Sequence, residues 1–165
     1  MTDARFEDGT GEAPLRLMAY GVDDLAIIST LVQDAVLTPG QLVYAAKRRR
    51  FALGLNRFRW EDAARAEGAG RGYERVQALL VVEEVQHVQS FGIQRGDASQ
   101  ALQLLALSFV AQDELGGWLR LHLSGGADLR LKVEALDVAL RDVSRPYLAP
   151  TGKRPDHGPD DTAHE

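Results

Sequence analysis

The sequence predicts an α+β domain dominated by antiparallel strands, and three observations carry that prediction. One segment with helical periodicity, VDDLAIISTLVQDAVL, is followed by several apolar segments whose hydrophobic residues alternate with a period of two. Turn-forming pairs such as Gly125–Gly126 separate neighbouring apolar segments at hairpin spacing. A chain of 165 residues with 45% apolar side chains is long enough to bury one core. We therefore expect about six to seven strands in a curved sheet or partly closed barrel, with one main helix packed against it.

The main helix is expected at residues 24–36. Asp23 is a suitable N-cap, and Pro39–Gly40 ends the helical pattern. The segment LRLMAY (15–20) before the helix is expected to form a short first strand. Apolar residues recur at helical spacing at Leu25, Ile28, Leu31, Val32 and Ala35.

After the helix the chain is expected to be mainly β-structure. Strands are predicted, in order, at residues 42–47, 50–58, 73–92, 104–111, 118–124 and 127–143. Residues 61–72 are expected to form a loop with one helical turn, and residues 95–102 a brief helix. The predicted core comprises Leu25, Ile28, Val32, Phe51, Leu53, Leu55, Leu119, Leu121, Leu131, Val133 and Val138.

The two longest predicted strands each change the face on which their apolar residues lie. The change falls in LVVEEVQH (80–87) in the first strand and in LKVEALDV (131–138) in the second. Because strand side chains alternate between faces, each change requires a bulge or a bend, and residues 73–92 are either one bent strand or two elements. The similarity suggests an internal repeat of strand, strand and long bent strand with a helix ahead of each copy; chance similarity between amphipathic strands is the alternative.

The composition of the chain ends predicts a single globular domain at residues 15–148 between two disordered tails, 1–14 and 149–165. Both tails are rich in Gly, Pro, Asp and Thr and offer little to bury. The acidic N-terminus lacks the apolar core of a signal peptide, and no segment approaches the roughly 20 apolar residues of a membrane-spanning helix. With no cysteine in the chain, we expect a cytoplasmic protein without membrane contact.

The charge of the chain is concentrated in its tails. Residues 1–14 hold four acids and one base, and residues 149–165 hold four acids and two bases. Removing these from the 24 acids and 19 bases of the whole chain leaves 16 of each in residues 15–148. A dedicated nucleic-acid module usually has a strongly basic domain. The neutral domain therefore argues against a globally basic nucleic-acid protein and leaves room for a local basic patch.

The strongest local charge pattern is KRRRFALGLNRFRW (47–60), in which cations alternate with aromatic residues. Such a pattern can grip phosphates and stack on bases, which predicts weak RNA or DNA binding as one function. The alternative is a hairpin whose turn is basic and whose arginine stems cover a sheet edge. The candidate nucleic-acid-binding residues are Lys47, Arg48, Arg49, Arg57, Arg59 and Trp60.

Glu83, Glu84 and His87 form the only internal carboxylate–imidazole cluster in the sequence, and His122 is a distant candidate to join it. A metal-dependent or acid–base enzyme would need at least three converging ligands. Satisfied or exposed histidines are far commoner than ligands, so we expect no metal and no cofactor. The glycine-rich segment GAGRG (68–72) is not expected to bind a dinucleotide. It follows a loop and opens a strand, whereas a dinucleotide fingerprint follows a strand and opens a helix.

Several segments of the sequence occur together in one known family: DDLAIISTLVQDAVL, RRFALGLNRFRWE, LLALSF, GGADLRLKVEALDVALRDV and KRPDH. They resemble an uncharacterised bacterial family, found mainly in alphaproteobacteria and catalogued as domain of unknown function 2948, over roughly residues 15–157. The resemblance implies a soluble bacterial protein and implies no activity, cofactor or catalytic residue.

The function expected from the sequence is therefore a non-catalytic binding or interaction domain of the bacterial cytoplasm. No catalytic constellation is assembled in the sequence, and small β-rich domains commonly bind through sheet faces, edges or loops. A protein partner is expected without being identified, and the sequence does not specify an oligomeric state. Weak nucleic-acid binding through residues 47–60 and chemistry at Glu83, Glu84 and His87 stand as the two alternatives.

Overall fold

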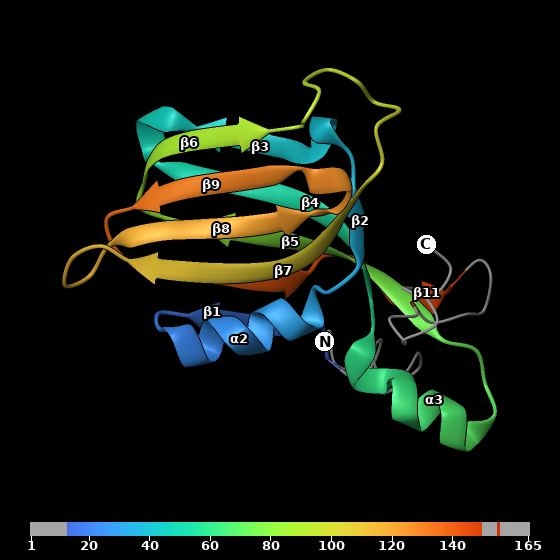
Figure 1. Ribbon diagram of the computed structural model, residues 1–165. Helices are drawn as coiled ribbons and strands as arrows, with labels where there is room; N and C mark the ends of the chain where they lie inside the picture. The colour runs from blue at the N-terminus through green and yellow to red at the C-terminus, as the bar shows by residue number, and fades with distance from the viewer. Residues whose placement is uncertain (1–12, 150–154, 156–165) are drawn as a thin grey trace.

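Eleven antiparallel strands curl into one sheet whose two ends do not meet, and two helices accompany it (Figure 1). The computed structural model describes residues 13–149 and 155. Apart from residues 13, 14, 149 and 155, the predicted tails lie outside the described residues. In the described part of the chain, no helix has the length and apolarity that crossing a membrane requires.

The eleven strands include several short ones. The strands are β1 (Arg16–Ala19), β2 (Ala35–Leu37), β3 (Leu42–Ala45), β4 (Arg50–Phe58), β5 (Glu74–Val82), β6 (Val85–Phe91), β7 (Leu102–Ala111), β8 (Gly117–Leu123), β9 (Asp128–Val133), β10 (Val138–Asp142) and β11 (Tyr147–Leu148). The α-helices are α2 (Val22–Leu31) and α3 (Ala63–Ala69), and the short 3-10 turns are η1 (Pro39–Gln41), η2 (Ala46–Arg48), η3 (Trp60–Asp62) and η4 (Ser124–Gly126). The α+β class is confirmed. The strand number exceeds six or seven because both long segments divide in two and short strands form beside them.

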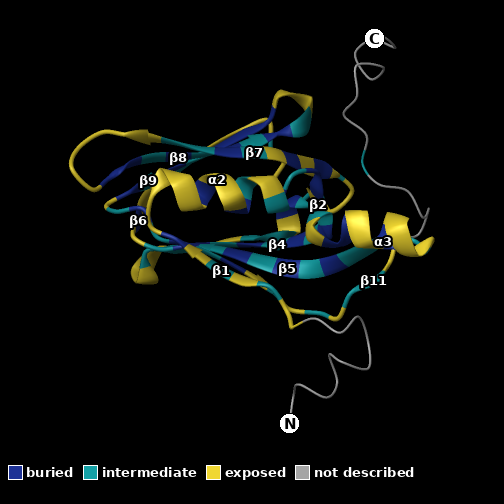
Figure 2. Cartoon of the chain, turned by 90° about the horizontal axis from the view of Figure 1, so that it is seen from below, coloured by how far each residue is buried: buried dark blue, intermediate teal, exposed yellow. Residues whose placement is uncertain are grey.

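The strands form two facing layers joined by β2. One layer has the order β3-β4-β5-β10-β1, the other has the order β7-β8-β9-β6, and β2 pairs with both β4 and β7. Figure 2 shows α2 between the two layers, and the helix packs against β7 and β1. The core lies between the layers, and all eleven predicted core residues are buried there.

Two bends exchange strands between the layers. The chain leaves β5 through Glu83 and Glu84 and continues as β6, which pairs with β9 in the other layer. It leaves β9 through residues 134–137 and returns as β10, which pairs with β5. Residues 73–92 are therefore two strands, and both predicted changes of face are confirmed as bends between layers.

The two bends are hydrogen-bonded to each other. The Glu83 backbone N–H donates to the Asp137 carbonyl at 2.9 Å, and the Glu134 N–H donates to the Glu84 carbonyl at 2.9 Å. Glu84 adopts a left-handed conformation with φ 59° that turns the chain sharply. Each bend thus satisfies backbone groups that the exchange of strands would otherwise leave unpaired.

The strand pairing repeats along the chain. In the first unit β4 lies between β3 and β5, and in the second unit β8 lies between β7 and β9. In each unit the strand after the bend crosses to the layer of the other unit. The parity changes in the sequence correspond to this topological repeat.

Only the first unit has a helix ahead of it. The predicted brief helix at 95–102 is wrong, because residues 92–101 form turns in which Gly92 and Gly96 have φ 71° and 79°. The Asp97 carboxylate also accepts a hydrogen bond from the Ser99 N–H at 2.9 Å, which favours a turn over a helix. Conversely, 61–72 contains the two-turn helix α3, whose end is fixed by left-handed Gly70.

The main helix is shorter at its C-terminus than predicted. α2 ends at Leu31, and its first turn contains Asp23 while Gly21 occupies the N-cap position. Asp34 has φ 66°, and its N–H donates to the Leu104 carbonyl of β7 at 2.7 Å. Pairing with β7 and β4 therefore takes residues 35–37 into β2 instead of the helix.

A substitution at Gly117 tests the close backbone contact between the start of β8 and the end of β7. A Cβ at this position would meet the carbonyl oxygen of Val110 and lie 2.9 Å from the Cα of Ala111. We expect Gly117→Ala to lower the free energy of unfolding by about 2 kcal/mol or more, since backbone cannot yield as a side chain can. Denaturant unfolding measures the change.

Gly68→Ala is the matched control, because Gly68 lies in α3 and a Cβ there meets nothing within 4 Å. It should raise the free energy of unfolding by about 0.5–1 kcal/mol through helix propensity. Equal effects of the two substitutions would contradict the predicted contact.

Candidate ligand-binding cleft

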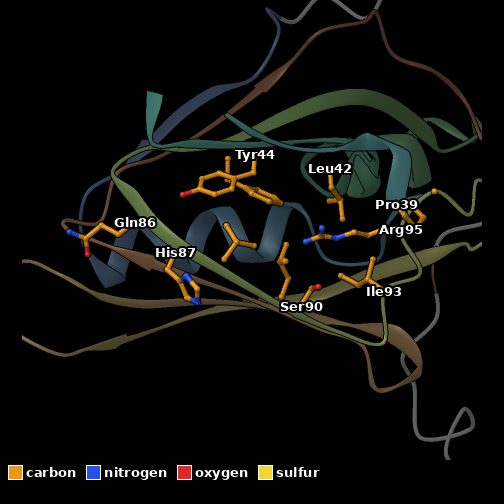
Figure 3. Close-up of a pocket in the computed structure, with 12 residues that line it drawn as sticks. Pro39, Leu42, Tyr44, Gln86, His87, Ser90, Ile93 and Arg95 are labelled. Atoms are coloured by element: carbon orange, nitrogen blue, oxygen red, sulfur yellow. The ribbon is translucent and has the colours of Figure 1, made fainter. Parts of the chain in front are cut away.

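The two layers leave an opening between them on each side, and only one of these two openings contains a helix. On one side α2 packs against β7 and β1, and Leu25 and Ile28 of the helix are buried between the layers. On the other side β3 and β6 are the facing edges, and the loop after β6 lies where the repeat would place a second helix. This opening forms a cleft of about 580 Å³ (Figure 3).

The apolar walls of the cleft follow from the register of the strands. Leu42 and Tyr44 of β3 stand opposite Leu53 and Phe51 of β4, so they share the core side of their layer. In the facing layer, Val88 and Ser90 stand opposite Leu131 and Leu129. The apolar lining residues are Pro39, Leu42, Phe51, Val88, Ile93 and Leu129.

One end of the cleft is closed by hydrogen bonds between the layers. The Tyr44 hydroxyl donates to the Val85 carbonyl at 3.3 Å, and the Val85 N–H donates to the Arg49 carbonyl at 2.8 Å. The loop residues Ile93 and Arg95 lie at the opposite end (Figure 3). The cleft is thus a slot with a fixed end and a loop-lined mouth.

The polar lining is sparse. Ser90 lies on the inner side of β6, and Gln86 and His87 line the cleft at the bulge of that strand. The guanidinium of Arg95 points into the cleft in Figure 3. No acidic residue of the described chain lines the cleft, and Arg95 makes no ion pair with a described residue. The cleft therefore combines an apolar interior with one fixed positive charge.

The basic stretch 47–60 does not form one surface. Lys47 and Arg48 are exposed in η2, and Arg49 ends that turn in a left-handed conformation with φ 54°. Arg49 is ion-paired with Glu134 and lies 3.7 Å from Glu84, while Arg50 pairs with Glu83 at 3.0 Å.

These pairs place two arginines beside the acidic bends between the layers. Burial raises the pKa of Asp137 in the same region, and the charges of Glu83 and Glu84 add to that effect. Arg49 and Arg50 offset this concentration of negative charge.

Arg57 is fully buried and belongs to the interior. Its Nε and Nη2 donate to the Asp142 carboxylate at 3.0 and 3.1 Å, and its Nη1 and Nη2 donate to the Glu61 carboxylate at 3.0 and 2.7 Å. Burial by itself would lower the pKa of Arg57, but the hydrogen bonds to Glu61 and Asp142 raise it overall. Arg57 thus joins β4, η3 and β10.

The last predicted nucleic-acid residues are also engaged inside the protein. Arg59 is buried and ion-paired with Glu74 of β5. The indole N–H of Trp60 donates to the Gln33 carbonyl at 2.9 Å, and its ring meets the edge of Phe58. Of the predicted set, Lys47, Arg48 and Arg49 are the cations that lie near the surface.

The predicted carboxylate–imidazole cluster is not brought together. Glu83 pairs with Arg50, and Glu84 projects from the bend. His87 stands opposite Lys132 with its ring edge-on to Trp118 and lines one part of the cleft, whereas His122 contacts the Ser108 hydroxyl at 2.8 Å. Within residues 13–149 and 155, no three His, Asp or Glu side chains are grouped to hold a metal ion.

Sequence reasoning missed the cleft, although it singled out one of the lining residues, His87, as a candidate for metal or acid–base chemistry. In the sequence, the apolar pattern indicates ordinary core residues at Leu42, Phe51 and Leu129. Arg95 lies in a segment that the sequence predicts to be a brief helix. A weak signal was present in the suspected repeat, since a repeat unit without its helix leaves its opening uncovered.

Arg57→Met tests the buried ion pairs. Removing Arg57 leaves the Asp142 carboxylate without a guanidinium partner and Glu61 with only Arg59, at 3.8 Å, so we expect the free energy of unfolding at neutral pH to fall by about 3–5 kcal/mol. Arg48→Met, in the exposed turn, should change it by less than about 0.5 kcal/mol. Denaturant titrations of both variants measure these changes.

The pH dependence gives a second readout of the same pairs. Burial alone would raise the pKa of Glu61, but its hydrogen bonds to Arg57 lower it below the ordinary 4.5. Its contribution to wild-type stability is therefore complete above pH 4.5 and is lost as the pH falls through the lowered pKa. Without Arg57, burial raises the pKa, so the deficit of Arg57→Met should narrow on acidification; a constant deficit would contradict this account.

Comparisons with known proteins bear on the whole domain. No curated protein and no solved structure matches the chain. A family model described as a protein of unknown function, DUF2948, matches residues 15–157 and thus the entire sheet and both helices. The chain belongs to the DUF2948 family.

Proposed function

We propose that this protein is a non-catalytic binding domain and that the cleft between β3 and β6 binds a small organic molecule with an apolar body. The observation that carries the proposal is that a helix fills only one of the two openings between the layers. The opening beside β7 and β1 is filled by the buried side chains of α2, whereas the opening between β3 and β6 is a cleft of about 580 Å³. Apolar surface facing water is unfavourable, so a ligand that covers it gains free energy.

The dimensions and lining of the cleft support a small ligand. Small-molecule sites typically measure about 300–1,000 Å³ and combine apolar walls with a few polar groups. Here Leu42, Phe51 and Leu129 supply walls, while Ser90 and Arg95 supply polar groups. The hydrogen bond from Tyr44 to Val85 fixes one end, so the site is formed before the ligand arrives.

The arrangement of the polar residues supports binding over catalysis. A nucleophile needs an adjacent general base within hydrogen-bond reach. Ser90 and His87 both line the cleft, opposite Leu129 and Lys132 of β9, but no hydrogen bond joins these two described side chains. The cysteine-free composition is consistent with a cytoplasmic setting.

Nucleic-acid binding remains a separate hypothesis, limited to the cations near the surface at Lys47, Arg48 and Arg49. Arg57 and Arg59 are buried in ion pairs and would have to break them to reach a phosphate. Such binding would be weak, because few phosphates would be neutralised.

Ser90→Phe tests the cleft by filling it. The neutral fluorescent probe N-phenyl-1-naphthylamine should bind the wild-type protein with increased emission. Ser90→Phe places a ring in the cleft, so the affinity for the probe should fall by at least about tenfold, equivalent to 1.4 kcal/mol. Gln89→Phe is the matched control, since Gln89 stands opposite Arg130 on the outer side of the same strand.

Thermal melting of both variants separates loss of binding from loss of fold. Equal affinity of Ser90→Phe and Gln89→Phe, or no probe binding by the wild type, would refute the proposed site.

A further inference from the structure

We infer that the ligand of the cleft is an amphipathic monoanion whose carboxylate is bound by Arg95. This inference rests on the proposed function and adds the chemical class of the ligand. It follows from the charge of the lining, from the absence of a carboxylate partner for Arg95 among the described residues, and from the position of its guanidinium in the cleft.

Arg95 is the only permanently charged residue among the described residues that line the cleft. The other described lining residues are apolar or polar and include His87, and Figure 3 shows the guanidinium pointing into the cleft from the loop after β6. Arg95 is an exposed residue, so its attraction for an oxyanion in the cleft is partly screened by water and salt. The cleft still has complementarity for a negative charge at its mouth.

Other arginines of this protein are paired with carboxylates, whereas Arg95 has no carboxylate partner among the described residues. Arg120 and Arg130 both donate to Asp128, at 2.9 and 2.8 Å, and Arg57 holds two carboxylates. The nearest acid to Arg95 in sequence is Asp97, and its carboxylate is committed to Ser99, whose hydroxyl and N–H lower the pKa of Asp97. No described acid therefore neutralises Arg95, so an anionic ligand does not have to displace one.

The shape of the site orients the ligand. The Tyr44 hydroxyl is occupied by Val85, so Tyr44 presents its ring, with the Phe51 ring 6.3 Å away, at the closed end. Ser90 on β6 adds a hydroxyl that can donate a second hydrogen bond to the anion. An apolar or aromatic body would lie between the layers with its carboxylate toward Arg95.

A carboxylate suits the site better than a phosphate. The planar fork of one guanidinium matches one carboxylate with two parallel hydrogen bonds. A phosphate group carries close to two negative charges at neutral pH and usually gathers more than one cation. The described lining offers a single permanent positive charge.

The test compares 4-phenylbutyrate with its neutral isostere 4-phenylbutanamide, each displacing N-phenyl-1-naphthylamine from the full chain. The wild type should bind the carboxylate about tenfold more tightly than the amide, as expected for one charge-assisted pair near the surface. Arg95→Gln should abolish this preference by weakening the carboxylate far more than the amide. Arg95→Lys should restore part of the preference, since it keeps the charge without the fork.

Arg48→Gln is the matched control, because it removes an exposed arginine outside the cleft and should keep the preference. Added salt should weaken binding of the carboxylate and not of the amide. Equal binding of both ligands by the wild type, or a preference that survives Arg95→Gln, overturns the inference and leaves the binding cleft standing. Failure of the probe and of both ligands to bind overturns the cleft itself.

Discussion

The exchange of strands between the two layers is the constraint on which the rest of the structure depends. Each long segment bends once, so that β6 and β10 complete the layer opposite to the one in which their own unit began. The two bends meet, and each donates a backbone hydrogen bond to the other. Because both layers contain strands from both units, neither unit can form its share of the core alone.

This exchange also explains the charges around the bends. Glu83, Glu84 and Glu134 gather where the bends meet, and Arg49 and Arg50 arrive there from the start of β4. The basic turn and the acidic cluster, which look like two candidate sites in the sequence, are therefore parts of one ion-paired junction. These pairs are half-exposed, so their contribution is modest and screened by salt. The buried pairs of Arg57 belong to a different class, since their charges are removed from water.

The same constraint creates the cleft. Two facing layers leave an opening on each side, and a repeated unit would supply a helix for each. The first unit supplies α2, and the second supplies a glycine-containing loop that carries Arg95 instead. The proposed binding function thus rests on a departure from the repeat: the opening without a helix keeps an apolar interior accessible from its mouth.

The sequence by itself determined the class of the fold, the core and the two bends. Alternation at Leu119, Leu121 and Leu123 specifies a buried strand face, and a change of parity requires a bend whatever the topology, because side chains alternate along every strand. Only the tertiary structure decided which strands pair across the bends, that Arg57 lies inside rather than on a nucleic-acid-binding surface, and that residues 35–37 join β7 rather than the helix. Those outcomes depend on partners that are distant in the sequence, such as Asp142 for Arg57 at a separation of 85. Local propensity carries no information about such partners, and for that reason the cleft was visible only in the folded chain.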